Sequence, residues 1–160
     1  PRLLSSAASD VYKRQVREMI QSFTKAAIRC EQAGFHGVEL HGAHSYLICQ
    51  FLGAKTNRRT DEWGGDIAGR SRFLIELITS IRAATSDNFL IGVRISPKIE
   101  KAGIYLEDSL ELAKILCQTD IDMLHISCWD VFEAVGDGNE ESLTKRFRNV
   151  IPHDLSLIHI

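Results

Sequence analysis

The chain has 160 residues and a formal net charge of −2, with 44% hydrophobic and 25% charged residues. These values are ordinary for one globular domain that buries a sizeable core. The small net charge gives no electrostatic reason to expect a nucleic-acid or anionic-membrane partner. No apolar stretch approaches the roughly 18–20 residues of a membrane span, and no secretory signal is evident.

The four cysteines are Cys30, Cys49, Cys117 and Cys128, which are widely and irregularly spaced. None forms a Cys-x-x-Cys pair, so neither a structural zinc site nor a redox dithiol is indicated. We expect isolated reduced thiols in a cytoplasmic protein.

The two ends of the chain differ from its middle. Residues 1–15 show no clear hydrophobic period, and residues 155–160 read Leu-Ser-Leu-Ile-His-Ile. Both segments resemble translated adapter read-through from environmental sequence assemblies. We therefore expect a non-native leader over 1–15, a non-native tail over 155–160 and the protein domain over 16–154, beginning and ending mid-gene.

The first predicted elements are a helix and a strand. From Val16 to Ala33, apolar residues recur at steps of three and four, which describes one helix face that stops at Gly34. The short run that follows has the composition of a buried parallel strand and ends near His41. A polar loop over 53–69 comes next and has no phosphate-loop spacing.

Two further helix–strand units follow the loop. The pattern predicts a helix over 70–84, a strand over 90–96 that Pro97 stops, a helix over 107–118 and a strand over 123–127. Helices and strands therefore alternate, which implies parallel strands joined by right-handed crossovers.

Each predicted strand has one aliphatic side and one side with polar groups. A doubly wound sheet needs both faces apolar, so the pattern favours part of a (β/α)₈ barrel whose polar positions point inward near its mouth. Three strands are less than half of such a barrel, which needs about 250 residues. The inward positions are Glu39, His41, Gly92, Arg94, Ser96, Met123, His125 and Ser127.

Candidate chemistry gathers where the first strand ends. If His41 points inward, a turn of three residues returns His44 to its side, and Tyr46 lies on the same turn. Two N–H donors then converge on one carbonyl oxygen, with a phenol nearby to deliver a proton. Two alternatives stay open: a histidine pair that caps the loop beside a packed tyrosine, and a zinc site, which would need a third ligand.

Arg94 is the second candidate, because a cation on an inward strand face is costly to bury without an anion. Its partner is either Glu39, which we expect within salt-bridge distance, or a negatively charged cofactor ring. A purely structural ion pair is the alternative. His125 is expected to be a satisfied core histidine.

Three segments, in the same order, resemble the old yellow enzyme family of FMN-dependent NADH:flavin oxidoreductases. They are residues 34–47 with 50–52, the loop 56–65 and the strand segment 92–97, so the resemblance covers about 16–154. It implies a partial (β/α)₈ TIM barrel, with FMN at the carboxyl ends of the strands.

The resemblance also implies roles for four residues. The histidines matching His41 and His44 bind the oxygen of an enone, the tyrosine matching Tyr46 donates a proton, and the arginine matching Arg94 lies against the flavin. NAD(P)H reduces FMN, which then reduces the C=C bond of an α,β-unsaturated carbonyl compound. The implied partner is thus a small-molecule enone-type substrate, no metal is expected, and homo-oligomerisation of the full-length protein stays open.

The chain departs from the family pattern in three ways. Ser45 stands where the family often has glycine, and Cys49 where a polar residue is common. The family's first strands and its last two, which bind the FMN phosphate, have no counterpart here. The alternatives are therefore a fragment of a 2,4-dienoyl-CoA reductase-like flavin and iron–sulfur enzyme, a truncated chain that is non-catalytic as it stands, and a metal-dependent barrel hydrolase.

Overall fold

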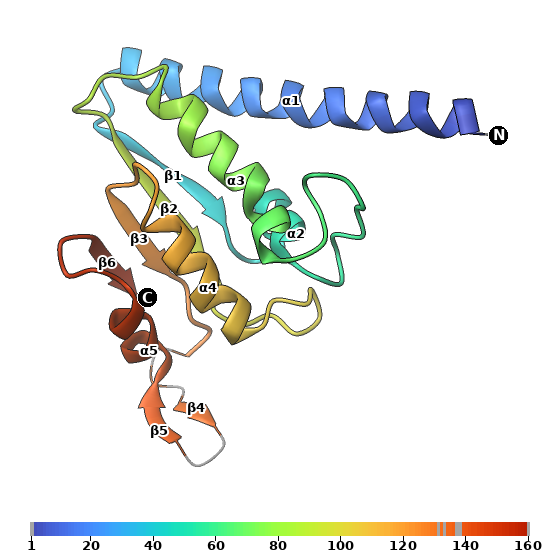
Figure 1. Ribbon diagram of the computed structural model, residues 1–160. Helices are drawn as coiled ribbons and strands as arrows, with labels where there is room; N and C mark the ends of the chain where they lie inside the picture. Colours follow the sequence, from blue (N-terminus) through green and yellow to red (C-terminus); the bar gives the residue numbers. More distant parts are fainter. Residues whose placement is uncertain (1, 131, 133, 137–138, 160) are drawn as a thin grey trace.

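Four parallel strands form the centre of the protein in the computed structural model, which describes residues 2–130, 132, 134–136 and 139–159 (Figure 1). Neighbouring strands pair in parallel, so their carboxyl ends meet at one edge of the sheet. The strands, in spatial order, are β1 (Gly37–Gly42), β2 (Leu90–Ile95), β3 (Met123–Ile126) and β6 (Ser156–His159).

The long helices pack side by side in chain order, α1 on α3, α3 on α4 and α4 on α5, as a layer beside the sheet (Figure 1). The short helix α2 (Leu47–Leu52) contacts both β1 and α3. The first turns of α1 extend away from the rest of the chain (Figure 1). The long helices are α1 (Arg2–Gln32), α3 (Ile67–Arg82), α4 (Leu106–Leu116) and α5 (Leu143–Val150).

The core lies between this helix layer and one side of the sheet. We call that side the helix-covered face. Val38 and Leu157 on this face are partly buried, and its buried strand residues are Leu40, Ile91, Val93, Ile95, Leu124 and Ile126. Aromatic rings extend the same core, since Phe73 of α3 stacks on Phe51 of α2 with ring centroids 4.3 Å apart. Each such buried side chain stabilises the fold by about 1.5–3 kcal/mol.

The opposite side, which we call the polar face, carries Glu39, His41, Gly92, Arg94, Met123 and His125. In the strand register, His41 lies opposite Arg94 and Arg94 opposite His125, so these three side chains form one row. The predicted inward parity of all three strands is therefore confirmed.

The predicted helices and strands are all present, and their ends differ by a few residues. Helix α3 begins at Ile67 rather than Arg70, because the carboxylate of Asp66 accepts a hydrogen bond from the Gly69 N–H at 2.9 Å and caps it. Helix α1 already begins at Arg2, within the segment that lacks a hydrophobic period.

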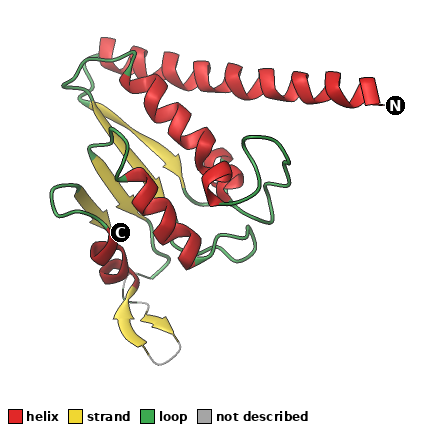
Figure 2. Ribbon diagram, in the orientation of Figure 1, coloured by secondary structure: helices red, strands yellow, loops and turns green. Residues whose placement is uncertain are grey.

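Several elements were not predicted. They are α2, the antiparallel hairpin of β4 (Ala134–Gly136) and β5 (Asn139–Ser142), helix α5, and β6, which makes a fourth parallel strand beyond the three expected. Figure 2 shows the hairpin set apart from the main sheet. No helix among the described residues is both long and apolar enough to cross a membrane.

Candidate active site

The candidate site lies at the carboxyl ends of β1, β2 and β3. Directly after β1 the backbone enters the left-handed region twice in succession, with φ 56° at His44 and 63° at Ser45. The His44 backbone N–H donates to Ser96 Oγ, 3.2 Å away, which ties this turn to the end of β2. The turn costs backbone strain, and in return it brings His44 back beside His41.

Three rings meet at this turn. The centroids of His41 and His44 are 5.1 Å apart with an interplanar angle of 75°, and those of His41 and Tyr46 are 5.0 Å apart. Tyr46 is the N-cap residue of α2 and is 61% exposed, so its ring is accessible to a ligand. The structure thus brings together the three side chains that the sequence selected for carbonyl chemistry.

Arg94 reaches the same cluster through Ser127. Arg94 Nη2 donates to Ser127 Oγ at 2.8 Å, and the same oxygen lies 2.8 Å from His44 Nε2. Ser127 follows β3 directly and is buried. A single hydroxyl therefore connects the predicted flavin-contacting arginine with a predicted carbonyl-binding histidine.

The surroundings of His44 favour its neutral form. His44 is exposed as a whole, but partial desolvation of its imidazole lowers its pKa, and the positive charge of Arg94 lowers that pKa further, with smaller effects from His41 and His125. At pH 7 the imidazole is therefore neutral, with one nitrogen that donates and one that accepts a hydrogen bond.

His125, at the end of this row, pairs with Glu39 across β2. His125 Nδ1 donates to Glu39 Oε2 at 2.8 Å. The strand between them carries Gly92, where a Cβ atom would lie 2.8 Å from Met123 Cε and 3.6 Å from Glu39 Cγ. The side chain of Glu39 therefore passes close over the glycine, and the one tight approach of a Cβ atom would be to the flexible end of Met123.

The expected ion pair between Glu39 and Arg94 is wrong. Among the described residues, Glu39 bonds to His125 and Arg94 to Ser127. The register explains the difference, since Glu39 lies opposite Gly92 whereas Arg94 lies opposite His41. Glu39 therefore finds open space above Gly92 and reaches the next strand instead.

Two nitrogens on the polar face have no partner in the part of the chain that the structure describes. They are Nε of Arg94 and Nε2 of His125, both buried. Buried polar atoms are rarely left without a hydrogen bond unless a ligand or water supplies it. Neighbouring nitrogens of this kind fit a ring with acceptor atoms on its edge, as the pyrimidine end of a flavin has, so the residues present are compatible with FMN.

A cleft of about 410 Å³ opens beside this row. Its walls come from the turn after β1 and from the segments that follow β2 and β3, so it is continuous with the ring cluster. Its lining residues are His44, Ser45, Ser96, Lys98, Ile99, Ser127, Cys128 and Trp129.

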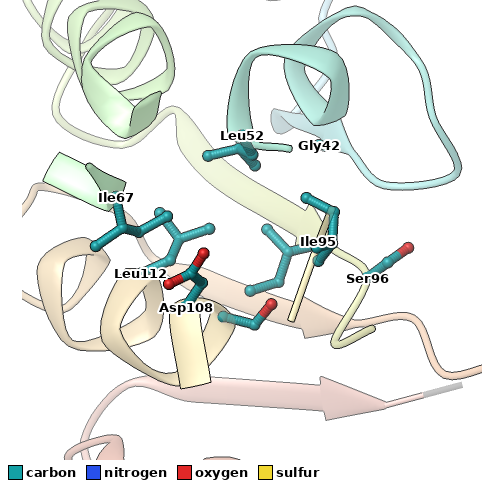
Figure 3. Close-up of a pocket in the computed structure, with 9 residues that line it drawn as sticks. Gly42, Leu52, Ile67, Ile95, Ser96, Asp108 and Leu112 are labelled. Carbon is teal, nitrogen blue, oxygen red and sulfur yellow. The ribbon is translucent and has the colours of Figure 1, made fainter. Parts of the chain in front are cut away.

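A second pocket, shown in Figure 3, lies under the helix-covered face between β2 and α2, α3 and α4. It is lined by Leu52, Ile67, Ile95 and Leu112, among others, and holds only about 10 Å³. That volume accepts at most one water molecule. It is a packing gap rather than a substrate site.

Comparison with known proteins decides the family. The family model described as "NADH:flavin oxidoreductase / NADH oxidase family" matches residues 5–153. The chain belongs to this family.

Individual relatives agree. A probable NADH-dependent flavin oxidoreductase of Bacillus subtilis is 36% identical over 138 residues, which are 83% of this chain and 37% of that protein. NADH:acrylate oxidoreductase of Vibrio harveyi is also 36% identical, over 88% of this chain and 15% of its own length.

Solved structures of similar proteins show which fold this chain belongs to. The old yellow enzyme homologue from Zymomonas mobilis superposes with a TM-score of 0.76 at 27% identity, over 92% of this chain and 42% of that one. The predicted old yellow enzyme resemblance and the partial (β/α)₈ barrel are thus confirmed. The chain spans less than half the length of these relatives.

Ser96 and Ser127 were not selected as candidate site residues in the sequence analysis. The signal was present, because each directly follows a strand and shares the parity of Arg94 or His125 within that strand. Within the described residues, no three His, Cys, Asp or Glu side chains gather as metal ligands.

Proposed function

We propose that the full-length protein containing this chain is an FMN-dependent NAD(P)H oxidoreductase that reduces the C=C bond of α,β-unsaturated carbonyl compounds. The observation that carries this proposal is the cluster of His41, His44 and Tyr46 beside Arg94 at the strand ends. Membership of the NADH:flavin oxidoreductase family supports the redox half. The name of the Vibrio harveyi relative supports the other half, since acrylate is an α,β-unsaturated carboxylate.

In the proposed reaction, the two histidines bind the substrate oxygen. N–H groups of His41 and His44 donate to the carbonyl oxygen and draw electron density toward it, which makes the β-carbon electrophilic. One well-placed donor of this kind lowers the barrier by about 3–4 kcal/mol. Because His44 is neutral at pH 7, it donates without adding a second cation beside Arg94.

Tyr46 completes the addition. Its hydroxyl, on an exposed ring next to His41, protonates the α-carbon while the β-carbon takes up hydride. Bound FMN would supply that hydride after accepting one from NAD(P)H. Arg94 would hold the polar edge of the flavin, where its unpartnered Nε faces no other acceptor among the described residues.

Tyr46→Phe in the flavin-loaded full-length protein tests the proposal. We expect enone reduction to fall by about 10²–10⁴-fold, the usual contribution of a general acid, while reduction of FMN by NAD(P)H is retained. Stopped-flow measurement of the two half-reactions separates these effects. Tyr105→Phe, another exposed tyrosine that is the N-cap residue of α4, is the matched control. Equal losses in both half-reactions would contradict the role of Tyr46.

A separate proposal concerns the 160-residue chain as an isolated molecule. We propose that it is not a complete flavin enzyme, because it spans only 42% of the superposed old yellow enzyme homologue. This proposal concerns the chain as an isolated molecule and is compatible with the activity proposed for the full-length protein.

A further inference from the structure

We propose that Ser127 is a positioning residue that holds His44 in the tautomer with its proton on Nδ1. The inference rests on the proposed function, since it states which N–H of His44 is offered to the substrate oxygen. Nothing in the sequence pattern alone distinguishes the two ring nitrogens of this histidine.

The first step is the direction of the bond from Arg94. A guanidinium has only donors, so Ser127 Oγ must accept the 2.8 Å hydrogen bond from Arg94 Nη2. The hydroxyl proton of Ser127 is then free to be donated elsewhere.

The second step is the destination of that proton. The other polar atom at Ser127 Oγ is His44 Nε2, also at 2.8 Å. Ser127 is 5% exposed, so solvent is a poor acceptor for its hydroxyl. If Nε2 carried a proton, Ser127 Oγ would accept twice and its own buried proton would be left without an acceptor among the described contacts.

The third step excludes a doubly protonated ring. Partial desolvation of the ring and the charge of Arg94 lower the pKa of His44 below its ordinary value, so one nitrogen carries the only ring proton at pH 7. With Nε2 accepting from Ser127, that proton lies on Nδ1. The chain of hydrogen bonds therefore runs from Arg94 through Ser127 to His44.

Two consequences follow for the ligand. Nε2 is occupied within the protein, so a substrate oxygen has to approach His44 from the Nδ1 side. The site therefore binds an acceptor oxygen, such as that of a neutral carbonyl. Without Ser127, the two tautomers would interconvert freely, and only a fraction of the enzyme would present the competent donor.

Nitrogen NMR of the imidazoles in the flavin-loaded full-length protein measures the tautomer directly, with His44→Gln used to assign the signals. We expect a protonated Nδ1 and an unprotonated Nε2 in the unmodified protein. A protonated Nε2 would overturn the proposal without any variant being made.

The variants extend the test. In Ser127→Ala we expect Nε2–H to become populated and KM for an enone to rise about threefold to tenfold, with a smaller change in kcat. Ser127→Thr keeps the hydroxyl and should retain the original spectrum and KM, which a merely space-filling role would not require. An unchanged tautomer in Ser127→Ala would refute the inference.

The outcome is separable from that of the proposed function. If Tyr46→Phe spared enone reduction, the proposed chemistry would fail while the tautomer result still stood. If Ser127→Ala failed to fold, the spectra of the unmodified protein and of Ser127→Thr would still decide.

Discussion

The two faces of the sheet differ in whether the chain itself supplies all of their packing and hydrogen-bond partners. On the helix-covered face, the strand side chains are buried or partly buried in the core that they form with helices of the same chain. On the polar face, Glu39 pairs with His125 and Arg94 with Ser127, yet buried nitrogens of Arg94 and His125 have no partner in the described part of the chain. Folding thus explains the first face, whereas the second is explained only if something outside the chain binds to it.

The largest expected effect concerns FMN retention by the chain itself. The residues of the polar face are compatible with a flavin, but the chain spans only 42% of the superposed homologue. We expect the purified 160-residue chain to carry no stoichiometric flavin, whereas the full-length protein carries one. Visible absorbance after gel filtration measures this. Co-purification of FMN with the chain at one per molecule would show that this half of the barrel is sufficient.

The next prediction compares, in the full-length protein, one substitution in the helix layer that packs on the helix-covered face with one on the polar face. Leu77 of α3 is fully buried, so Leu77→Ala should lower the free energy of unfolding by about 2–5 kcal/mol. Glu39 is part-exposed and Glu39→Gln keeps an acceptor for His125, so its cost should be below about 1 kcal/mol.

For the flavin's midpoint potential, the order of the two variants should be reversed: Glu39→Gln should have the larger effect and Leu77→Ala the smaller. Glu39→Gln removes a negative charge from the polar face, so we expect the potential to shift, whereas Leu77→Ala should leave the potential unchanged once the variant is folded. Urea denaturation and spectroelectrochemical titration supply the two measurements. A stable Leu77→Ala variant with an altered potential would break the distinction between the faces.

The sequence predicts the helix-covered face well, because burial follows the alternation of aliphatic residues along each strand. The same alternation placed His41, Arg94 and His125 on one side, as the register confirms. Helix α5 was missed although Ser142 caps it by accepting from the Lys145 N–H, since its buried residues Leu143 and Phe147 span too short a segment to establish a period.

The contacts of the polar face could not be predicted to the same extent. Alternation states which residues share a face but not which of them touch. Glu39 passes over Gly92, the residue opposite it on the next strand, to reach His125 on the strand after that. The link through Ser127 depends on a segment after β3 lying beside a turn after β1, 83 residues away along the chain. Such contacts depend on three strands at once, whereas the patterns read from sequence are local.

The smallest expected effect concerns the turn that serves the polar face. Ser45 has φ 63°, a conformation that costs a residue with a Cβ atom about 1–2 kcal/mol and glycine almost nothing. Glycine also loses about 0.5–1 kcal/mol through its greater freedom in the unfolded chain, so Ser45→Gly should stabilise the full-length protein by less than about 1 kcal/mol. Ser45→Ala keeps the strained φ and is the matched control, and it should not stabilise; urea denaturation compares the three proteins. If glycine and alanine changed the free energy of unfolding equally, the turn would carry no backbone strain. His44 would then be placed beside His41 without a conformational cost, and the turn would not differ in this respect from the helix-covered face.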